Sequence, residues 1–329
     1  MSSSEKKDVI TEQRVHKLKA KAFFNLLKSP PENVAVFSFD CEKNLPLPKL
    51  PDQASYFTQQ INYYNFTVVR GSSTTSLVPE NVYSYVWTEV DFAKNSNSTA
   101  SAVWDALVKS SFLGEIDTIH LFADGCGRQN KNSIMMTMLS VWLMKKAPQN
   151  GVRYDCEKEV KKKSVVVKPS DYEKIIAHRS TIRKLGVDWQ VYDWKSEAQT
   201  HMKTPSAWHF QFNKKKRFVF TRGKANVLIR GESNYYADIG EAKSVLKRGK
   251  NTSAINSTEL DIGCKLKGDK STIISLLKKH YGDTWEENPD LSFLKEALVT
   301  SRAEQDNMPE TDVESGCRSI KPCDINLPI

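Results

Sequence analysis

Three β-type segments follow one another in this chain without a helix between them, and this order restricts the fold most. Residues 33–40 (NVAVFSFD), part of residues 56–69 (YFTQQINYYNFTVV) and residues 82–87 (VYSYVW) are rich in Val, Phe and Tyr, as strands are. Apolar residues at helical spacing then predict a helix over 100–112. A fourth strand is predicted at Thr118–Ala123, so the chain is expected to be an α/β protein.

The predicted order continues with a strongly apolar helix at 133–146. Three antiparallel strands followed by alternating helices and strands match the ribonuclease H-like core. We therefore expect a ribonuclease H-like mixed sheet flanked by helices over residues 32–168. An N-terminal helix within residues 1–31 precedes it, closed by the prolines that follow Lys28.

A basic α+β extension is expected at residues 169–299, after a segment in which 165–167 is the one strand-like run. Its predicted helices are 171–185, 271–282 and 291–299, and its predicted short strands are 187–194, 208–212, 217–222 and 226–230. The tail, residues 300–329, is acidic and nearly free of aromatic residues, so it is expected to be disordered.

Two of the predicted strands end on a carboxylate, Asp40 and Asp124. Asp and Gly are common in turns after strands, so a simple turn is one interpretation. The other is a metal site, because open α/β sheets bind ligands at the carboxyl ends of their strands. Mg²⁺ or Mn²⁺ would suit such oxygen ligands, and a two-metal site also needs a third carboxylate.

Three amides follow Asp124 closely: Gln129, Asn130 and Asn132. They could bind phosphate or another ligand beside the metal, or they could cap the helix that begins at 133. The sequence leaves these two interpretations open. It contains no GxxxxGK[ST] phosphate loop and no GxSxG nucleophile motif, so the metal site is the main catalytic hypothesis.

Positive charge is concentrated in one part of the chain. Residues 200–280 contain 17 Lys and Arg against 6 Asp and Glu, whereas residues 283–329 contain 4 against 11. This pattern favours a polyanion-binding surface, although a solvated Lys-rich face would look the same. The basic residues expected to contact DNA are Lys214, Lys215, Lys216, Arg217, Arg222 and Lys224.

The cysteines bear on the compartment in which the protein works. The six cysteines are scattered, without a CxxC pair or zinc-ligand spacing, and no apolar run is long enough to cross a membrane. The first residues also lack the apolar core of a secretory signal. A reducing compartment is therefore expected, nuclear or cytoplasmic, and DNA as partner favours the nucleus.

Three stretches of the chain resemble one protein family. They are FSFDCEKNLPLPKLPDQASYFTQQINYYNF (37–66), IHLFADGCGRQNKN (119–132) and KHYGDTWEENPDLSFLKEAL (279–298). The family is transposon-derived, common in animal genomes, and has a DDE transposase-like, ribonuclease H-like core. The resemblance implies that Asp40 and Asp124 match the family's first and second strand-end aspartates. Arg128 stands where the family motif GCGGQNKN has a glycine.

The chain departs from the family pattern after Lys146. Family members carry another apolar strand and a GHSF-like turn there, followed by a helix that begins with an aspartate. The core of this chain is accordingly expected to lack one strand segment near residues 147–156. Glu157 and Glu159 match glutamates that follow this point in the family, so Glu157 is the expected third carboxylate and metal ligand.

The resemblance implies a function as well as a fold. The ancestral activity would be Mg²⁺-dependent phosphoryl transfer on DNA, meaning strand cleavage and strand transfer. The missing segment predicts that this activity is impaired, so we expect a transposase-derived DNA-binding protein that binds Mg²⁺ or Mn²⁺. The alternatives are a catalytically dead nucleic-acid-binding or protein-interaction module, and a partial gene product without function. The sequence leaves a homo-oligomer open and identifies no protein partner.

Overall fold

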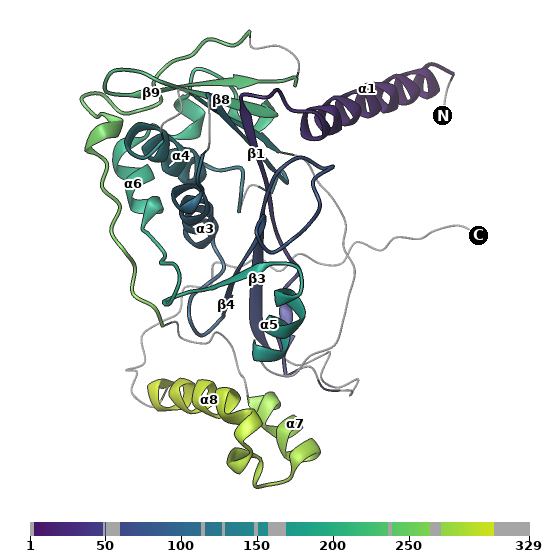
Figure 1. Cartoon of the computed structure of the whole chain (residues 1–329), viewed down its shortest axis with the longest axis vertical. Coiled ribbons are helices and arrows are strands. Elements are labelled where there is room, and N and C mark those ends of the chain that lie inside the picture. Colours follow the sequence, from purple (N-terminus) through teal and green to yellow (C-terminus); the bar gives the residue numbers. More distant parts are fainter. Residues whose placement is uncertain are drawn as a thin grey trace.

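The structure is an α/β arrangement around a single mixed sheet (Figure 1). It is a computed structural model that describes residues 3–48, 50, 60–112, 116–126, 129–147, 151–156, 169–235, 239–263 and 271–305. Over this part of the chain the sheet has nine strands, in the order β7-β4-β3-β1-β5-β6-β8-β9 with β2 beside β3, and there are seven α-helices. The α/β fold with a mixed sheet, expected from the sequence, is therefore confirmed.

The first three long strands pair antiparallel, as their direct succession in the sequence predicts. β1 (Val34–Cys41) pairs with β3 (Ile61–Arg70), which pairs with β4 (Val82–Thr88). The short strand β2 (Leu45–Leu47) pairs with β3. After α3 (Ser96–Lys109) the chain returns as β5 (Thr118–Ala123), which pairs parallel with β1. This order places the carboxyl ends of β1 and β5 at the same edge of the sheet.

The core was expected to lack a strand segment near residues 147–156, and a strand is present there. β6 (Gly151–Cys156) pairs parallel with β5 and antiparallel with β8 (Arg217–Arg222), so backbone groups on both of its sides are satisfied. Val152 and Tyr154 are buried and alternate with polar residues. Two alternating apolar residues in a polar stretch are too weak a pattern to identify from the sequence.

The segment predicted as a basic extension contributes strands to the same sheet. β8 and β9 (Val227–Glu232) were both expected, and they extend the sheet beyond β6. The strands expected at 187–194 and 208–212 are wrong. The first stretch leads into α6 (Trp194–His201), and the second is irregular backbone that ends at Phe212, where a 3-10 turn (Phe212–Lys214) begins. Their aromatic residues face the core from irregular backbone, and this burial mimics the pattern of a strand.

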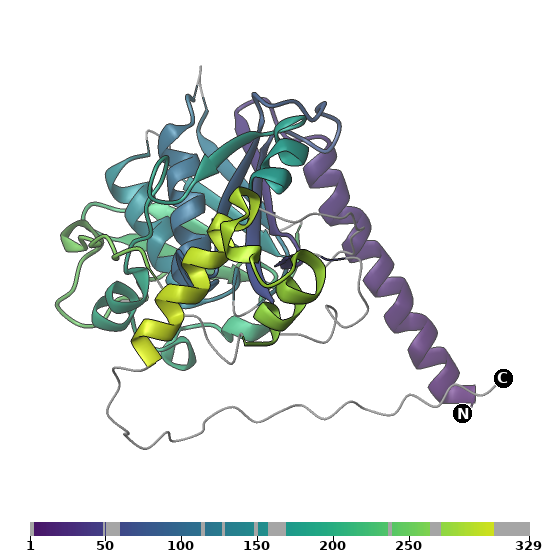
Figure 2. The same ribbon diagram turned by 90° about the horizontal axis from the view of Figure 1, so that it is seen from below.

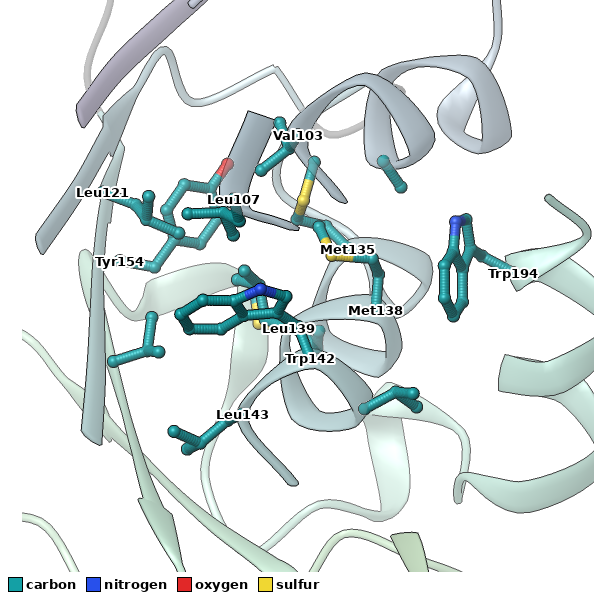
Figure 3. Packing of buried hydrophobic residues seen from close by; sticks show 14 of the residues in the cluster. Val103, Leu107, Leu121, Met135, Met138, Leu139, Trp142, Leu143, Tyr154 and Trp194 are labelled. Carbon is teal, nitrogen blue, oxygen red and sulfur yellow. The ribbon is translucent and has the colours of Figure 1, made fainter. Parts of the chain in front are cut away.

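One face of the sheet is covered by α3 and α4 (Ser133–Lys145), and α6 packs against these two helices. α4 is buried over nearly its whole surface, because every residue from Met135 to Leu143 is buried. Figure 3 shows Leu139 and Trp142 of this helix packed between the sheet and the neighbouring helices. The apolar sequence SIMMTMLSVWLM has this composition because the helix has no solvent-facing side.

The opposite face of the sheet carries α1 (Ser3–Lys28), which is longer than the predicted helix (Figure 2). Near its C-terminal end, Phe23 packs edge-on against Phe122 of β5 and Tyr235, with ring centroids 5.2 and 5.5 Å apart. The N-terminal part of the helix extends away from the sheet (Figure 1). The contact at Phe23 therefore positions α1 beside the ends of β1 and β5.

A second apolar cluster lies against β2, β3 and β4. It is formed with α5 (Pro169–Ala177), α7 (Ser271–Tyr281) and α8 (Ser292–Gln305). The helix predicted over 171–185 ends at Ala177, because Thr181–Lys184 forms β7, which pairs parallel with β4. The predicted disordered tail begins too early, since α8 continues through Gln305. Residues 306–329, like the strand-like run 165–167, lie outside the described residues.

Asp193 begins α6 and joins it to α3. Burial of its carboxyl raises the pKa, but hydrogen bonds from the hydroxyl and backbone N–H of Ser196 and from the Asn97 amide outweigh burial and leave the pKa lowered. The carboxylate form is thus favoured by folding, and the stability that it contributes is present above the unfolded-state pKa of about 3.9.

We expect Asp193→Ala to lower the free energy of unfolding by about 1 kcal/mol at neutral pH, as loss of an N-cap does. The difference from wild type should shrink as the pH falls through the lowered folded-state pKa, because the native carboxylate is then protonated. Urea unfolding between neutral and acidic pH measures it. Asn95→Ala removes the uncharged cap of α3 and should show a pH-independent loss. This account would be contradicted if the difference in free energy of unfolding between Asp193→Ala and wild type stayed constant down to a pH below the folded-state and unfolded-state pKa values of Asp193.

Candidate metal and nucleic-acid site

The two strand-end aspartates lie side by side. β1 and β5 pair parallel with Phe39 in register with Ala123, so Asp40 and Asp124 follow directly at adjacent positions. Neighbouring strands are about 5 Å apart, so the two Cα atoms are close enough for one ion to bridge the side chains. The proximity of these two residues is what the sequence pattern predicted.

Both aspartates line one cavity, of about 770 Å³, between α1 and the sheet. Ser38 and Thr67 form part of its floor on β1 and β3. Lys131 and Lys216 also line it, and the Lys131 ammonium donates to the Asn213 carbonyl at 2.9 Å. The α1 residues that line the cavity are His16, Ala20, Phe23, Phe24 and Leu27. One side of the cavity is therefore charged and the other is mainly apolar.

The loop after β5 holds the Asp124 carboxylate. Its Oδ1 accepts hydrogen bonds from the Asn130 amide and, at 3.3 Å, from the backbone N–H of Cys126. The Cys126 carbonyl in turn accepts the backbone N–H groups of Asn130 and Lys131, at 2.8 and 3.0 Å. Asp40 Oδ1 accepts the backbone N–H of Cys41 at 2.6 Å. Local bonds thus orient both carboxylates before any ligand binds.

The three amides turn out to have structural contacts. Asn132 caps α4, since its side chain accepts the backbone N–H of Met135 at 2.9 Å. Asn130 is fully buried and orients Asp124. Gln129 accepts hydrogen bonds through its backbone carbonyl, from Thr99 and Asn132. None of the three amides is among the residues that line the cavity, so the helix-cap interpretation fits Asn132 and a positioning role fits Asn130.

The donor set at this edge suits one hard cation. Mg²⁺ needs only one or two carboxylates and keeps water or phosphate oxygens as its other ligands, and Asp40 with Asp124 meets that need. In the described part of the chain, no group of three or more Asp, Glu, His or Cys side chains could hold a metal. Glu157 lies outside the described residues, directly after Cys156, which is in register with Ala123.

The six predicted DNA-contacting residues fall into two groups. Lys214, Lys216 and Lys224 are exposed, and Lys215 is half-buried with its ammonium on the Ser233 hydroxyl at 3.2 Å. Lys216 is the member of the set that reaches the cavity. Lys131 and Lys216 supply positive charge beside the two aspartates, whereas Lys224 follows β8 at the opposite edge of the sheet.

The two predicted arginines are used inside the fold. Arg217 is only 3% exposed, and its Nη1 donates to the Tyr235 carbonyl at 2.7 Å. Arg222 donates through Nη2 to the carbonyls of Leu143 and Ala147, at the C-terminal end of α4. A cation there satisfies carbonyls that the helix leaves unpaired. Because both arginines are engaged in these hydrogen bonds, neither belongs to the candidate DNA-binding surface. Sequence composition alone cannot distinguish such arginines from exposed lysines.

Lys131 and α1 line the cavity although neither was predicted from the sequence as part of the site. Lys131 stands in the quoted GCGRQNKN segment, so a signal was available. No such signal existed for α1, because an amphipathic helix does not reveal which face of a sheet it covers.

The chain matches no protein-family model, no curated protein and no solved structure. Among the described residues, no helix has the length and apolar character needed to span a bilayer.

Arg217 and Lys214 should respond differently to truncation. We expect Arg217→Ala to lower the free energy of unfolding by about 2 kcal/mol, because the buried Tyr235 carbonyl loses its donor and the side chain leaves a void. Lys214→Ala, its matched control three residues earlier, should change stability by less than about 0.5 kcal/mol. Urea unfolding of both variants measures the difference. Equal effects would show that Arg217 has no structural role.

Proposed function

We propose that this chain is a transposase-derived nucleic-acid-binding protein that holds one Mg²⁺ or Mn²⁺ ion between Asp40 and Asp124. The proposal rests on one observation: the two carboxylates follow paired parallel strands and line a single cavity together with Lys131 and Lys216. A divalent cation held there, with two ammonium groups beside it, suits a phosphate group of a nucleic acid.

The strand order supports the proposed ancestry. β4, β3 and β1 form an antiparallel meander, and β5 and β6 then continue the sheet parallel to β1. This is the order expected for a ribonuclease H-like core, with aspartates at the carboxyl ends of the first and fourth of those strands along the chain. The family resemblance drawn from the sequence motifs agrees with it and remains part of the proposal.

Asp40 and Asp124 are sufficient to hold one divalent cation beside a bound nucleic acid. A bound divalent cation would polarise phosphate oxygens and lower the pKa of a bound water molecule. Asp40 and Asp124 would hold this ion, and Asn130 would keep Asp124 in place. Two-metal cleavage needs a further carboxylate, and Glu157, the residue expected in that role, lies outside the described residues. The proposed protein acts on DNA in the nucleus chiefly by binding it, and impaired phosphoryl transfer is part of the same proposal.

Calorimetric titration with Mn²⁺ tests the metal site. Wild type should bind one ion, and Asp40→Asn/Asp124→Asn should lose that binding because amides replace both anionic ligands. The double variant should fold at least as stably as wild type, since it removes two like charges about 5 Å apart. Urea unfolding checks this point.

Asp117→Asn is the matched control for the metal experiment. Asp117 is exposed and precedes β5, at the opposite end of the strand from Asp124. It should bind Mn²⁺ as wild type does. The metal proposal would be refuted by a cooperatively folded wild type that binds no ion, or by binding that survives in the double variant.

Salt dependence tests the nucleic-acid surface. Fluorescence anisotropy of a labelled DNA should show an affinity that falls steeply as salt rises, because bound lysines release counterions from the phosphates. Lys214→Ala/Lys216→Ala should weaken binding and reduce the slope of log K against log salt by about one per lost phosphate contact.

The control for this slope is Lys278→Ala/Lys279→Ala on α7, at the other end of the sheet from β8 and β9 in Figure 1. This pair is also exposed. Each double variant removes two lysines, so the net charge changes equally in both. An unchanged slope for Lys214→Ala/Lys216→Ala, or the same reduction in both pairs, would show that the exposed lysines beside the cavity do not contact DNA.

A further inference from the structure

The cavity beside Asp40 and Asp124 has two chemically different sides. The side formed by the sheet edge carries these two aspartates with Lys131 and Lys216. The side formed by α1 is lined by Ala20, Phe23, Phe24 and Leu27, with His16 as its polar member. A ligand that fills the cavity would therefore meet charged groups at one end and mainly apolar groups at the other.

Phe24 is the unusual residue on the α1 side. It lines the cavity, yet 54% of it is exposed to solvent. Its neighbour Phe23 is 9% exposed and packs edge-on against Phe122 and Tyr235, so Phe23 is the buried aromatic residue that attaches the helix to the sheet. The two rings are 5.9 Å apart and nearly perpendicular. Phe24 thus presents an aromatic ring to the cavity without a packing role that would require it.

The charged side of the cavity indicates which ligand group would bind beside Asp40 and Asp124. The charges of Asp40 and Asp124 and those of Lys131 and Lys216 cancel, so a divalent cation between the carboxylates would leave this side positive. A phosphate would then be attracted to it. A heteroaromatic base gains about 1–3 kcal/mol by stacking on a protein aromatic ring, with little dependence on which base it is. Phosphate and base together describe a nucleotide.

The size of the cavity limits how the nucleotide arrives. A volume of about 770 Å³ lies in the range of sites for single small molecules, roughly 300–1,000 Å³. A base inside a duplex is paired on one edge and stacked on both faces, so it cannot reach such a site unless it leaves the helix. A single strand or an unpaired end presents its bases without that cost.

We infer that this cavity takes one unpaired nucleotide of a nucleic-acid strand, with its base on Phe24 and its phosphate beside Asp40, Asp124, Lys131 and Lys216. The inference rests on the proposed function and specifies its substrate as single-stranded rather than duplex nucleic acid. It also gives α1 a defined part in the site, as the element that supplies the stacking surface.

Binding of two DNA probes in the presence of Mn²⁺ tests the inference on the full chain. One is an oligothymidylate of about 12 nucleotides, within the site sizes of single-strand binders, and the other is a duplex of the same length. Wild type should bind the single strand more tightly. Phe24→Ala should weaken single-strand binding about tenfold, as loss of one stacked base does. Phe24→Trp should retain it.

Leu18→Ala is the matched control, because Leu18 is 62% exposed on the same helix and is not among the residues that line the cavity. It should bind the single strand as wild type does. Equal losses for Phe24→Ala and Leu18→Ala, or tighter binding of the duplex by wild type, would overturn the inference. Loss of binding in Phe24→Trp together with Phe24→Ala would do the same.

Mn²⁺ calorimetry on Phe24→Ala separates this inference from the proposed function. Phe24 supplies no metal ligand, so the variant should bind the ion as wild type does, which also shows that the fold around the aspartates is intact. If the ion binds and Phe24 has no effect on DNA, the inference fails and the metal site stands. If wild type binds neither Mn²⁺ nor DNA, the proposed function fails as well.

Discussion

The parallel pairing of β1 with β5 is the interaction on which the rest of this structure depends. It joins the N-terminal meander to the helical half of the chain, with Val34–Phe39 in register with Thr118–Ala123. A shift of one residue would turn one aspartate to the opposite face, because side chains alternate along a strand. That face is occupied by α3 and α4 and is apolar. The packing of these helices therefore specifies the register that brings the carboxylates together.

Two different demands meet at this edge of the sheet. The fold buries Arg217 and Glu232, each 3% exposed, on neighbouring strands β8 and β9. The cavity, a short distance along the sheet, leaves acidic and basic groups in contact with solvent. Buried charges must be hydrogen-bonded, whereas charges that serve a ligand must stay accessible. This division explains why basic residues adjacent in sequence, Lys216 and Arg217, have unrelated roles.

Elements with a strong local sequence pattern were predictable, and elements with a weak or misleading pattern were not. Asp40 and Asp124 were predictable as a pair, because each ends a long apolar strand of known order. β6 was not, because its buried apolar residues Val152 and Tyr154 are flanked by polar residues. Trp208 and Phe212 looked like alternate residues of a strand, but they pack against the core from turns. Burial produced the same pattern there without any strand pairing.

The sequence by itself determined the α/β class, the order of the central elements and the two strand-end carboxylates. These follow from local periodicity and from how consecutive strands must connect. Only the tertiary structure decided that β6, β8 and β9 join one sheet, that Arg217 and Arg222 are internal, and that α1 covers the aspartates. Each of these depends on contacts between residues distant in sequence, which a local pattern does not encode. The role proposed for the exposed ring of Phe24 also depends on tertiary structure, because the cavity beside it forms only when α1 packs against the sheet.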